Sequence, residues 1–327
     1  MLDERRIVSP APHRYSPTNQ IDYRVAEIEE TIIKTLSPCI SLLLLSVVVS
    51  CAAYEPGQRS AAAGPYLGQK PPGSTPEIFA PGIVNTEENR EIEGMFGADM
   101  NTFYFIRRPL GEESSSNALV AMTNEGGLWR EKSILQGVSE PSVSPDGSTI
   151  YLKTKYIQRT DDGWSDPESL GSPFDGIDIF RLSAASSGTY YLDTFTPELD
   201  APLRYSRLID GQYEQPRSLG PQFAIGRYNA HPYIAPDESY VIWDSRRDDG
   251  YGSSDLYISY REIDGSWGPA INLGDRINTP GAENYPSVSP DGKFLFFDRR
   301  GEAVNGEAPV DIFWVDAGFI EALRPSP

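Results

Sequence analysis

Y-P-S-V-S-P-D-G-K-F-L-F-F-D-R-R, the sequence of residues 285–300, decides the fold of this chain. Its centre, S-P-D-G at residues 289–292, has the composition of a tight turn, because proline presets φ, aspartate bonds to the nearby backbone and glycine readily adopts a positive φ. Strand-forming residues lie on both sides of this turn, so the stretch predicts a β-hairpin. Residues 294–297 are apolar on both faces, which is typical of a strand covered on each side by a neighbouring sheet.

The same turn and strand recur along the chain. S-P-D-G is found again at residues 144–147 and A-P-D-E at residues 235–238, and weaker copies are centred on Asp99 and Ser187. Successive copies lie 41 to 54 residues apart. A second hairpin, in which Asp-Gly is followed by an aromatic residue, closes most units, as in D-G-S-W at residues 264–267. Four short antiparallel strands repeated at this spacing predict the blades of a β-propeller.

The predicted propeller is all-β and has five blades, the last of which lacks a fourth strand of its own. After the strand expected at residues 311–315 the chain continues for only twelve residues. Residues 75–86, before the first hairpin, occupy the place where other units carry their fourth strand. We therefore expect this N-terminal segment to pair with the last blade, so that the ring closes without an open edge. The propeller domain is predicted to span residues 75–327.

The part of the chain before the propeller predicts export and anchoring. Residues 1–34 are polar and aperiodic, which indicates a disordered extension or a mis-assigned start. Residues 35–51 combine an uncharged apolar run with V-V-S-C, which is typical of a signal peptide that ends in a lipobox with Cys51 as the lipidated residue. The alternative is an uncleaved signal anchor. Residues 52–74, rich in Ala, Gly, Pro and Ser, predict a flexible tether.

Charge and cysteine content restrict the partners and the location. The net charge of −19 repels nucleic acid and anionic lipid, so neither is expected as a direct ligand of the domain, whereas sugars, cations or a basic protein are compatible. The only cysteines, Cys39 and Cys51, lie in the predicted signal, so the domain has no disulfide. We expect a monomer in the cell envelope, held by its lipid to the periplasmic face of the outer membrane or to the cell surface.

The repeats resemble the WD40-like (PD40) repeat of TolB-like propellers. The resemblance is carried by P-S-V-S-P-D-G at residues 286–292, by the strands D-L-Y and D-I-F at residues 255–257 and 311–313, and by the Asp-Gly turns with a following tryptophan. It covers roughly residues 76–324 and implies a propeller fold, while the repeat positions themselves are structural. TolB also has an N-terminal α/β domain and a six-bladed propeller, where this chain has a predicted tether and five predicted blades.

Candidate ligand-binding residues follow from the register of the repeat. Propellers bind ligands at a mouth of the central channel, in loops before the first strand and after the second strand of each blade. Six residues before each turn lie side chains that would form one ring: Glu93, Glu140, Arg181, His231 and Tyr285. Nine residues after it lie basic side chains: Arg108, Lys155, Arg246 and Arg300. The alternative for the basic side chains is structural pairing with acidic residues such as Asp255 and Asp311.

The sequence assigns no catalytic residue, metal site or cofactor. A histidine-based metal site or catalytic triad would have to use His231 alone, because His13 lies outside the domain. The acidic loop at residues 244–250 lacks the alternation of a calcium loop. We therefore expect a non-catalytic scaffold that binds a glycan or a protein. The alternative is a glycan-active enzyme, a glycosidase or lyase, with Glu93 and Glu140 as its carboxylate pair.

Overall fold

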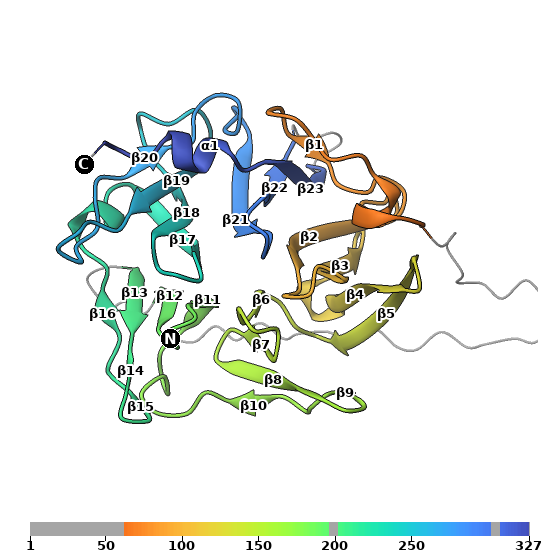
Figure 1. Cartoon of the computed structure of the whole chain (residues 1–327), viewed down its shortest axis with the longest axis horizontal. Helices are drawn as coiled ribbons and strands as arrows, with labels where there is room; N and C mark the ends of the chain where they lie inside the picture. The colour runs from red at the N-terminus through yellow and green to blue at the C-terminus, as the bar shows by residue number, and fades with distance from the viewer. Residues whose placement is uncertain (1–61, 196–201, 302–307, 327) are drawn as a thin grey trace, which may run out of the picture. The chain divides into compact units, whose positions relative to one another are not determined.

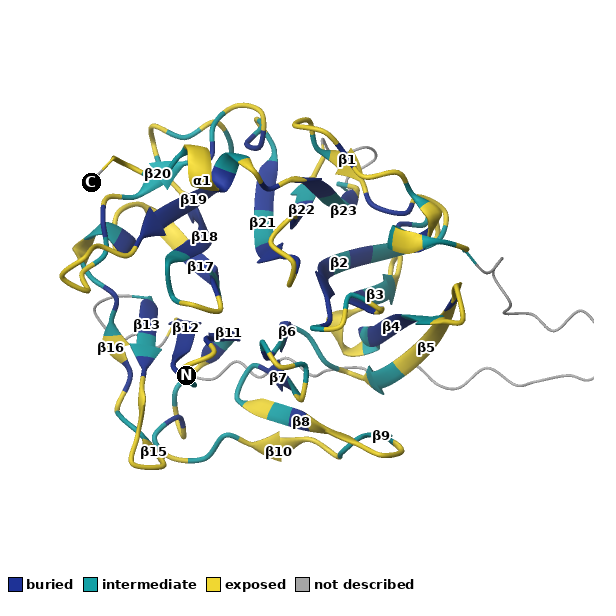
Figure 2. Ribbon diagram, in the orientation of Figure 1, coloured by how far each residue is buried: buried dark blue, intermediate teal, exposed yellow. Residues whose placement is uncertain are grey.

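The computed structural model describes residues 62–195, 202–301 and 308–326, which form a ring of five antiparallel sheets (Figure 1). This arrangement confirms the five-bladed β-propeller predicted from the repeats. The first strand of each blade lies beside the central axis, and the later strands follow outward. Figure 2 shows that the inner strands are largely buried, whereas exposed residues gather in the connecting loops and on the outer strands.

Two predictions for the N-terminal part lie outside the described residues. These are the extension at residues 1–34 and the signal at residues 35–51, which includes Cys51. Within the part of the chain that is described, no helix is long and apolar enough to cross a membrane.

Consecutive strands of a blade pair with one another in antiparallel register. Blades one and two consist, in chain order, of β2 (Asn89–Phe96), β3 (Thr102–Pro109), β4 (Ala118–Glu125) and β5 (Leu128–Gln136), then β6 (Pro141–Val143), β7 (Thr149–Leu152), β8 (Lys155–Thr160), β9 (Gly163–Trp164) and β10 (Glu168–Ser169). Blades three and four consist of β11 (Ile179–Ala184), β12 (Tyr190–Thr194), β13 (Leu203–Ser206) and β16 (Arg217–Ser218), with a side hairpin of β14 (Leu208–Ile209) and β15 (Gln212–Tyr213), then β17 (Arg227–Ile234), β18 (Tyr240–Arg246), β19 (Asp255–Tyr260) and β20 (Ile271–Asn272).

The last blade combines strands from both ends of the domain. It consists of β21 (Ala282–Val288), β22 (Phe294–Arg300), β23 (Val310–Asp316) and β1 (Glu77–Ile78). The short helices are η1 (Pro65–Gly68), η2 (Ser114–Ser116), η3 (Pro221–Phe223) and α1 (Phe319–Ala322).

The ring is closed by β1, as the sequence predicts. β1 pairs with β23 in antiparallel register, with Glu77 opposite Trp314. Phe79 continues this pairing, since its N–H donates to the Ile312 carbonyl at 2.9 Å. The outermost strand of the last blade therefore comes from the start of the domain, and it covers the outer edge of β23.

Asn85 extends the closure beyond the two residues of β1. Its side-chain amide accepts the N–H of Ile312 at 2.8 Å and donates to the Ile312 carbonyl at 3.2 Å. The same amide donates to the Phe79 carbonyl at 2.6 Å. Because Asn85 is buried, losing either partner would leave a polar group unsatisfied away from water.

The prediction of a flexible tether is wrong for residues 62–74. Trp129 of β5 donates its indole N–H to the Gly64 carbonyl at 2.7 Å. Leu67 is buried in the core between the first and last blades, and the Tyr66 ring packs edge-on against aromatic rings of the same core. The composition of this segment is that of a linker, but these two large side chains hold it against the ring.

The core between the first and last blades is rich in aromatic residues. Phe79 is fully buried, and its ring centroid lies 4.5 to 6.1 Å from those of four other rings: Phe96, Phe103, Phe296 and Trp314. Tilted and edge-to-face contacts at these distances are favourable in addition to the burial of apolar area. On β22, Phe296 faces this core, while its neighbour Phe297 faces the core shared with the fourth blade. Both faces of that strand are covered, as its apolar sequence predicts.

Phe79→Ala tests whether closure depends on this core. We expect the free energy of unfolding to fall by about 3–5 kcal/mol, because a buried phenyl ring is lost and a cavity remains. Denaturant unfolding of the full chain measures the change. Ile263→Ala is the matched control, since Ile263 is fully exposed and its loss should change stability by less than about 0.5 kcal/mol. Equal effects of the two substitutions would contradict closure by this segment.

Candidate functional site

The innermost strand is distorted at the same point of the repeat in four blades. Its pairing with the second strand shifts register at residues 92–95 in β2, 179–182 in β11, 230–233 in β17 and 284–287 in β21. In the remaining blade, β6 begins immediately after the equivalent residue, Glu140. A β-bulge of this kind turns a side chain out of the sheet, here toward the axis of the ring.

Four of the residues at these points have a left-handed backbone although none is glycine. The angle φ is 63° at Glu93, 61° at Glu140, 50° at His231 and 56° at Tyr285. Such a conformation costs a non-glycine residue of order 1–3 kcal/mol and persists only where its surroundings impose it. Glycine would adopt it at no such cost, so these positions hold a side chain in the channel at the expense of stability.

These side chains and Arg181 converge, as the register of the repeat predicts. We call Glu93, Glu140, Arg181, His231 and Tyr285 the hub. The Tyr285 hydroxyl donates to Glu140 at 3.1 Å, and the Tyr285 ring centroid lies 3.9 Å from that of His231. Arg181 Nη1 lies 4.0 Å from Glu93 Oε2. His231 Nε2 lies 3.9 Å from Glu140 Oε2. The contact between Tyr285 and Glu140 joins the last blade to the second, across the centre of the ring.

Buried aspartates on the second strands hold the backbone of the hub. Asp298 accepts the N–H of Glu93 with both carboxylate oxygens, at 2.9 and 3.0 Å. Asp193 accepts the N–H of Arg181 at 2.6 Å and that of His231 at 2.7 Å. Each of these carboxylates therefore ties its own blade to the first strand of the following blade.

Asp244 completes this set of carboxylates. It accepts the N–H of Tyr285 at 3.3 Å and the side-chain amide of Asn284 at 3.0 Å, and it lies 2.6 Å from Nδ1 of His231. None of these three aspartates is among the candidates that the register of the repeat predicts. Their signal is an aspartate that ends an apolar second strand, as in F-F-D and I-W-D, but the same pattern also occurs in ordinary strand ends.

The hub is not the open channel mouth that the sequence predicts. Glu93, Glu140 and Arg181 are 1%, 3% and 2% exposed, and His231 is 8% exposed. The reason is that these residues lie within or beside the innermost strands and face one another, instead of lying in loops. Four of their atoms have no hydrogen-bond partner among the described residues: Glu93 Oε2, Glu140 Oε2, Arg181 Nη1 and His231 Nε2. Buried polar atoms are seldom left unpaired, so the hub has capacity for further hydrogen bonds.

Burial and crowding shift the pKa values of the hub. Burial and, after it, the Glu93 carboxylate raise the pKa of Glu140 to about 8. Burial opposes a charge on His231, but the surrounding carboxylates, Asp244 foremost, outweigh it and raise the pKa of His231 to about 9. Burial also raises the pKa of Glu93. At neutral pH the hub therefore holds protons that the same groups would release in water. In the described part of the chain, no group of three or more His, Cys, Asp or Glu side chains is placed to hold a metal ion.

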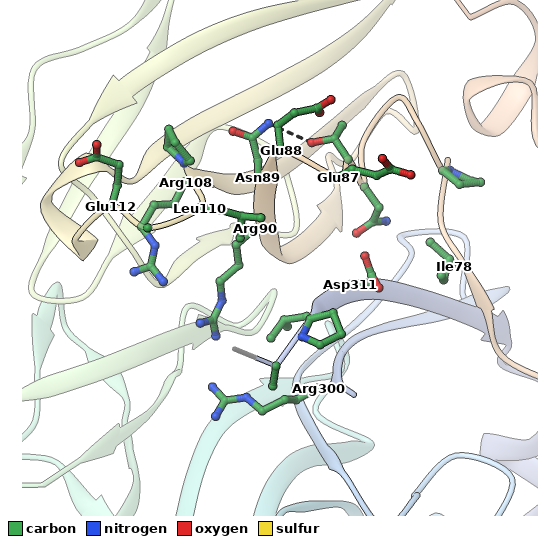
Figure 3. A pocket seen from close by; sticks show the side chains of 18 of the residues that line it. Ile78, Glu87, Glu88, Asn89, Arg90, Arg108, Leu110, Glu112, Arg300 and Asp311 are labelled. Carbon is green, nitrogen blue, oxygen red and sulfur yellow. Dashed lines mark hydrogen bonds between the residues drawn. The ribbon is translucent and has the colours of Figure 1, made fainter. Parts of the chain in front are cut away.

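A cavity of about 1200 Å³ lies between the first and last blades, at the end of the channel where β2 begins. We call it the arginine pocket, because Arg90, Arg108 and Arg300 line it. Figure 3 shows their guanidinium groups along one side of the cavity. Carboxylates also line it: Glu87, Glu88 and Asp311 lie away from the guanidinium groups, and Glu112 lies beside Arg108. The register of the repeat predicts Arg108 and Arg300 as candidates but not Arg90, which lies opposite Arg108 in the pairing of β2 with β3.

The other two basic candidates do not join the arginine pocket. Lys155 begins the third strand of blade two, where it lies opposite Ser169, because β7 ends after four residues and the register of the repeat is lost. Arg246 ends β18 and is exposed, but it is not among the residues that line the pocket. Of the four basic candidates, only Arg108 and Arg300 therefore line the same pocket.

The alternative of structural pairing with Asp255 or Asp311 also fails for these residues. Asp255 accepts the backbone N–H groups of Tyr251 and Gly252 at 2.7 and 3.0 Å instead. Asp311 forms no ion pair with a described residue, and burial raises its pKa.

Comparison with known proteins shows similarity of fold at low sequence identity. No protein-family model and no curated protein matches this chain. TolB from Acinetobacter baumannii is 14% identical, with 72% of this chain and 59% of TolB covered and a TM-score of 0.43. The alpha-L-arabinofuranosidase PaAbf62A from Podospora anserina, in complex with cellotriose, is 12% identical, with 74% and 93% covered and a TM-score of 0.44. A protein of unknown function from Dyadobacter fermentans is 11% identical, with 74% and 98% covered and a TM-score of 0.45.

The raised pKa values of the hub predict that the protein loses stability at alkaline pH. When the folded pKa lies above the unfolded one, the folded state holds a proton that the unfolded chain has released, so the free energy of unfolding falls as the pH rises between the two values. This window runs from 4.5 to about 8 for Glu140 and from 6.5 to about 9 for His231. We therefore expect Tm, measured by calorimetry, to fall between about pH 6.5 and pH 9.

Glu140→Gln provides the check on this assignment. Glutamine does not titrate, so the fall in Tm over the same pH range should be smaller than in the unsubstituted protein. Glu125→Gln is the control, because Glu125 is exposed and should leave the slope unchanged. A Tm that stays constant or rises toward pH 9 would show that the hub does not retain these protons.

Proposed function

We propose that this chain is an exported, lipid-anchored β-propeller that binds a glycan or a protein without catalysing a reaction on it. The ligand is bound at the end of the channel that carries the arginine pocket, which we call the ligand end. One observation carries the proposal: this end combines a large open cavity with exposed apolar and aromatic side chains.

These exposed side chains surround the channel in three blades. They are between 42% and 66% exposed: Leu110, Phe195, Ile225, Tyr228 and Tyr251. Each lies after a second strand, or before or at the start of a first strand, so the antiparallel order of the blades brings all of them to the ligand end. Tyrosine and arginine are enriched at binding surfaces, because they provide both contact area and hydrogen bonds.

The burial of the hub argues against catalysis by its two carboxylates. Glu93 and Glu140 converge, as a glycosidase requires, but both are almost fully buried, and neither lines the arginine pocket or the cavity of about 290 Å³ at the other end of the channel. Both carboxylates already face protein groups, since the Tyr285 hydroxyl donates to Glu140 at 3.1 Å and Arg181 Nη1 lies 4.0 Å from Glu93 Oε2. We therefore assign the hub to holding the five inner strands together.

One observation favours a glycan-active enzyme as the second candidate. The raised pKa of Glu140, about 8, would keep this group protonated at neutral pH, as a general acid must be. Release of reducing sugar from a glycan by the purified chain, abolished in Glu140→Gln and in Glu93→Gln, would favour the enzyme over the binding protein.

Tyr228→Ala tests binding at the ligand end. Ligands are first isolated by retention of envelope glycans and proteins on the detergent-solubilised full chain. Binding of a retained ligand should weaken about tenfold or more, as expected for removal of an exposed aromatic contact at an interface. Alanine keeps a Cβ, so the left-handed backbone at this position, with φ of 52°, is no more or less strained than before. Ile263→Ala, at the opposite end of the channel, should bind normally. Equal binding by both variants would contradict the placement of the ligand.

Export and anchoring are proposed from the sequence that precedes the propeller. V-V-S-C ends at Cys51, after an uncharged apolar run, and the repeats resemble those of PD40 propellers. In a bacterial host that processes lipoproteins, Cys51→Ser should move the protein from the membrane fraction to the soluble fraction, whereas Cys39→Ser should not. A Cys51→Ser protein that stays with the membrane would favour the uncleaved signal anchor.

A further inference from the structure

Arg90, Arg108 and Arg300 lie together although their charges repel one another. Arg90 is directly opposite Arg108 in the pairing of β2 with β3, and Arg300 ends β22 in the neighbouring blade. Their guanidinium groups lie on the same side of the arginine pocket (Figure 3). Like charges placed opposite one another destabilise a sheet, so folding alone does not account for this cluster.

In two of these strands the residue before the pocket arginine is also an arginine, and that arginine is paired with a carboxylate. Arg107 Nε lies 2.8 Å from a Glu91 oxygen, and Arg299 Nε lies 2.9 Å from a Glu283 oxygen. The chain contains 47 aspartates and glutamates, so partners are abundant. Yet none of the three pocket arginines forms an ion pair with a described carboxylate. The pocket arginines therefore differ from their neighbours in having charge available for a ligand.

Arg90 gives a second, independent indication of a ligand. Its Nε is buried and has no hydrogen-bond partner among the described residues. Burial, followed by repulsion from Arg300 and Arg108, lowers the pKa of Arg90. An anion between the guanidinium groups would accept the unused N–H and offset this repulsion.

Other parts of the pocket wall have the opposite chemistry. Glu87, Glu88 and Asp311 line them together with Asn89. Their oxygens accept hydrogen bonds from hydroxyl groups but repel a second anionic charge. The pocket therefore suits a molecule with one oxyanion and several hydroxyl groups. Its volume of about 1200 Å³ is above the roughly 300–1,000 Å³ of ordinary small-molecule sites, which leaves room for more than one sugar ring.

We infer that the arginine pocket binds an acidic saccharide whose carboxylate, phosphate or sulfate group contacts Arg90, Arg108 and Arg300. A planar guanidinium binds such groups through two parallel N–H···O bonds. The sugar hydroxyls donate to the carboxylates of the remaining wall. An acidic peptide fits less well, because its additional carboxylates would face Glu87 and Glu88. This inference rests on the proposed function, since it names the ligand class for the same end of the channel.

The test measures which saccharides the detergent-solubilised full chain binds. A glycan array with neutral, uronate-bearing, phosphorylated and sulfated saccharides identifies the class, and its separate acidic sets distinguish the three oxyanions. Calorimetry then compares the strongest acidic binder with its neutral counterpart and with inorganic phosphate. We expect the acidic saccharide to bind at least tenfold more tightly than either, and Arg300→Gln to weaken its binding about tenfold or more.

Two controls separate binding from folding. Arg130→Gln removes an exposed arginine that is paired with Glu125, and should leave binding unchanged. The Tm of the Arg300→Gln protein should stay the same or rise, because repulsion in the cluster is relieved, whereas loss of a structural contact would lower it.

The remaining outcomes overturn the inference in distinguishable ways. Retention of neutral glycans only, or binding lost in Tyr228→Ala but not in Arg300→Gln, would overturn the acidic ligand and leave the proposed function in place. Inorganic phosphate binding as tightly as the acidic saccharide would overturn the saccharide. Failure of the chain to retain any glycan or protein would contradict the proposed function as well.

Discussion

The pairing of β1 with β23 is the constraint on which the rest of the ring depends. A five-bladed ring can bury both faces of every blade only if the last blade meets the first, and that contact is made by residues from the two ends of the domain. The pairing itself is only two residues long. It is accompanied by the Phe79 ring in the aromatic core and by the Asn85 amide on the backbone of β23. A short strand is sufficient here because buried packing, and not backbone pairing alone, closes the ring.

The hub shows how the same ring is fixed at its centre. Inner strands of a propeller converge, and their backbone N–H groups at the bulges need acceptors that the sheet does not supply. The buried aspartates supply them, from the same blade or from the preceding one. This solution concentrates carboxylates in a space with little water, and the positive charges of Arg181 and His231 offset them. This arrangement raises pKa values and keeps residues in a strained backbone conformation. The hub therefore fixes the positions of the inner strands at some cost to the free energy of unfolding.

The sequence predicts those structural features that recur once in every repeat. The turns, the blade number, the closing strand and the convergence of the hub residues all follow from the period, because equivalent positions of a closed ring lie at equivalent heights. The period does not tell whether such a position lies in a loop or inside a strand, and the hub is buried for that reason. It also fails where a blade deviates, as at Lys155, where β7 is short. Arg90 and Asp298 contribute through pairing across strands and between blades, which depends on three-dimensional distances that no single-sequence pattern contains.

The buried hub also separates the two ends of the central channel. Its side chains meet from five blades, four of the five are buried, and the cavities on its two sides share no lining residue. The two cavities are therefore separate sites and not the two openings of one continuous channel. A molecule bound at one end must leave by the same opening through which it entered. Each end can consequently acquire or lose a binding specificity by substitution without altering the chemistry of the other.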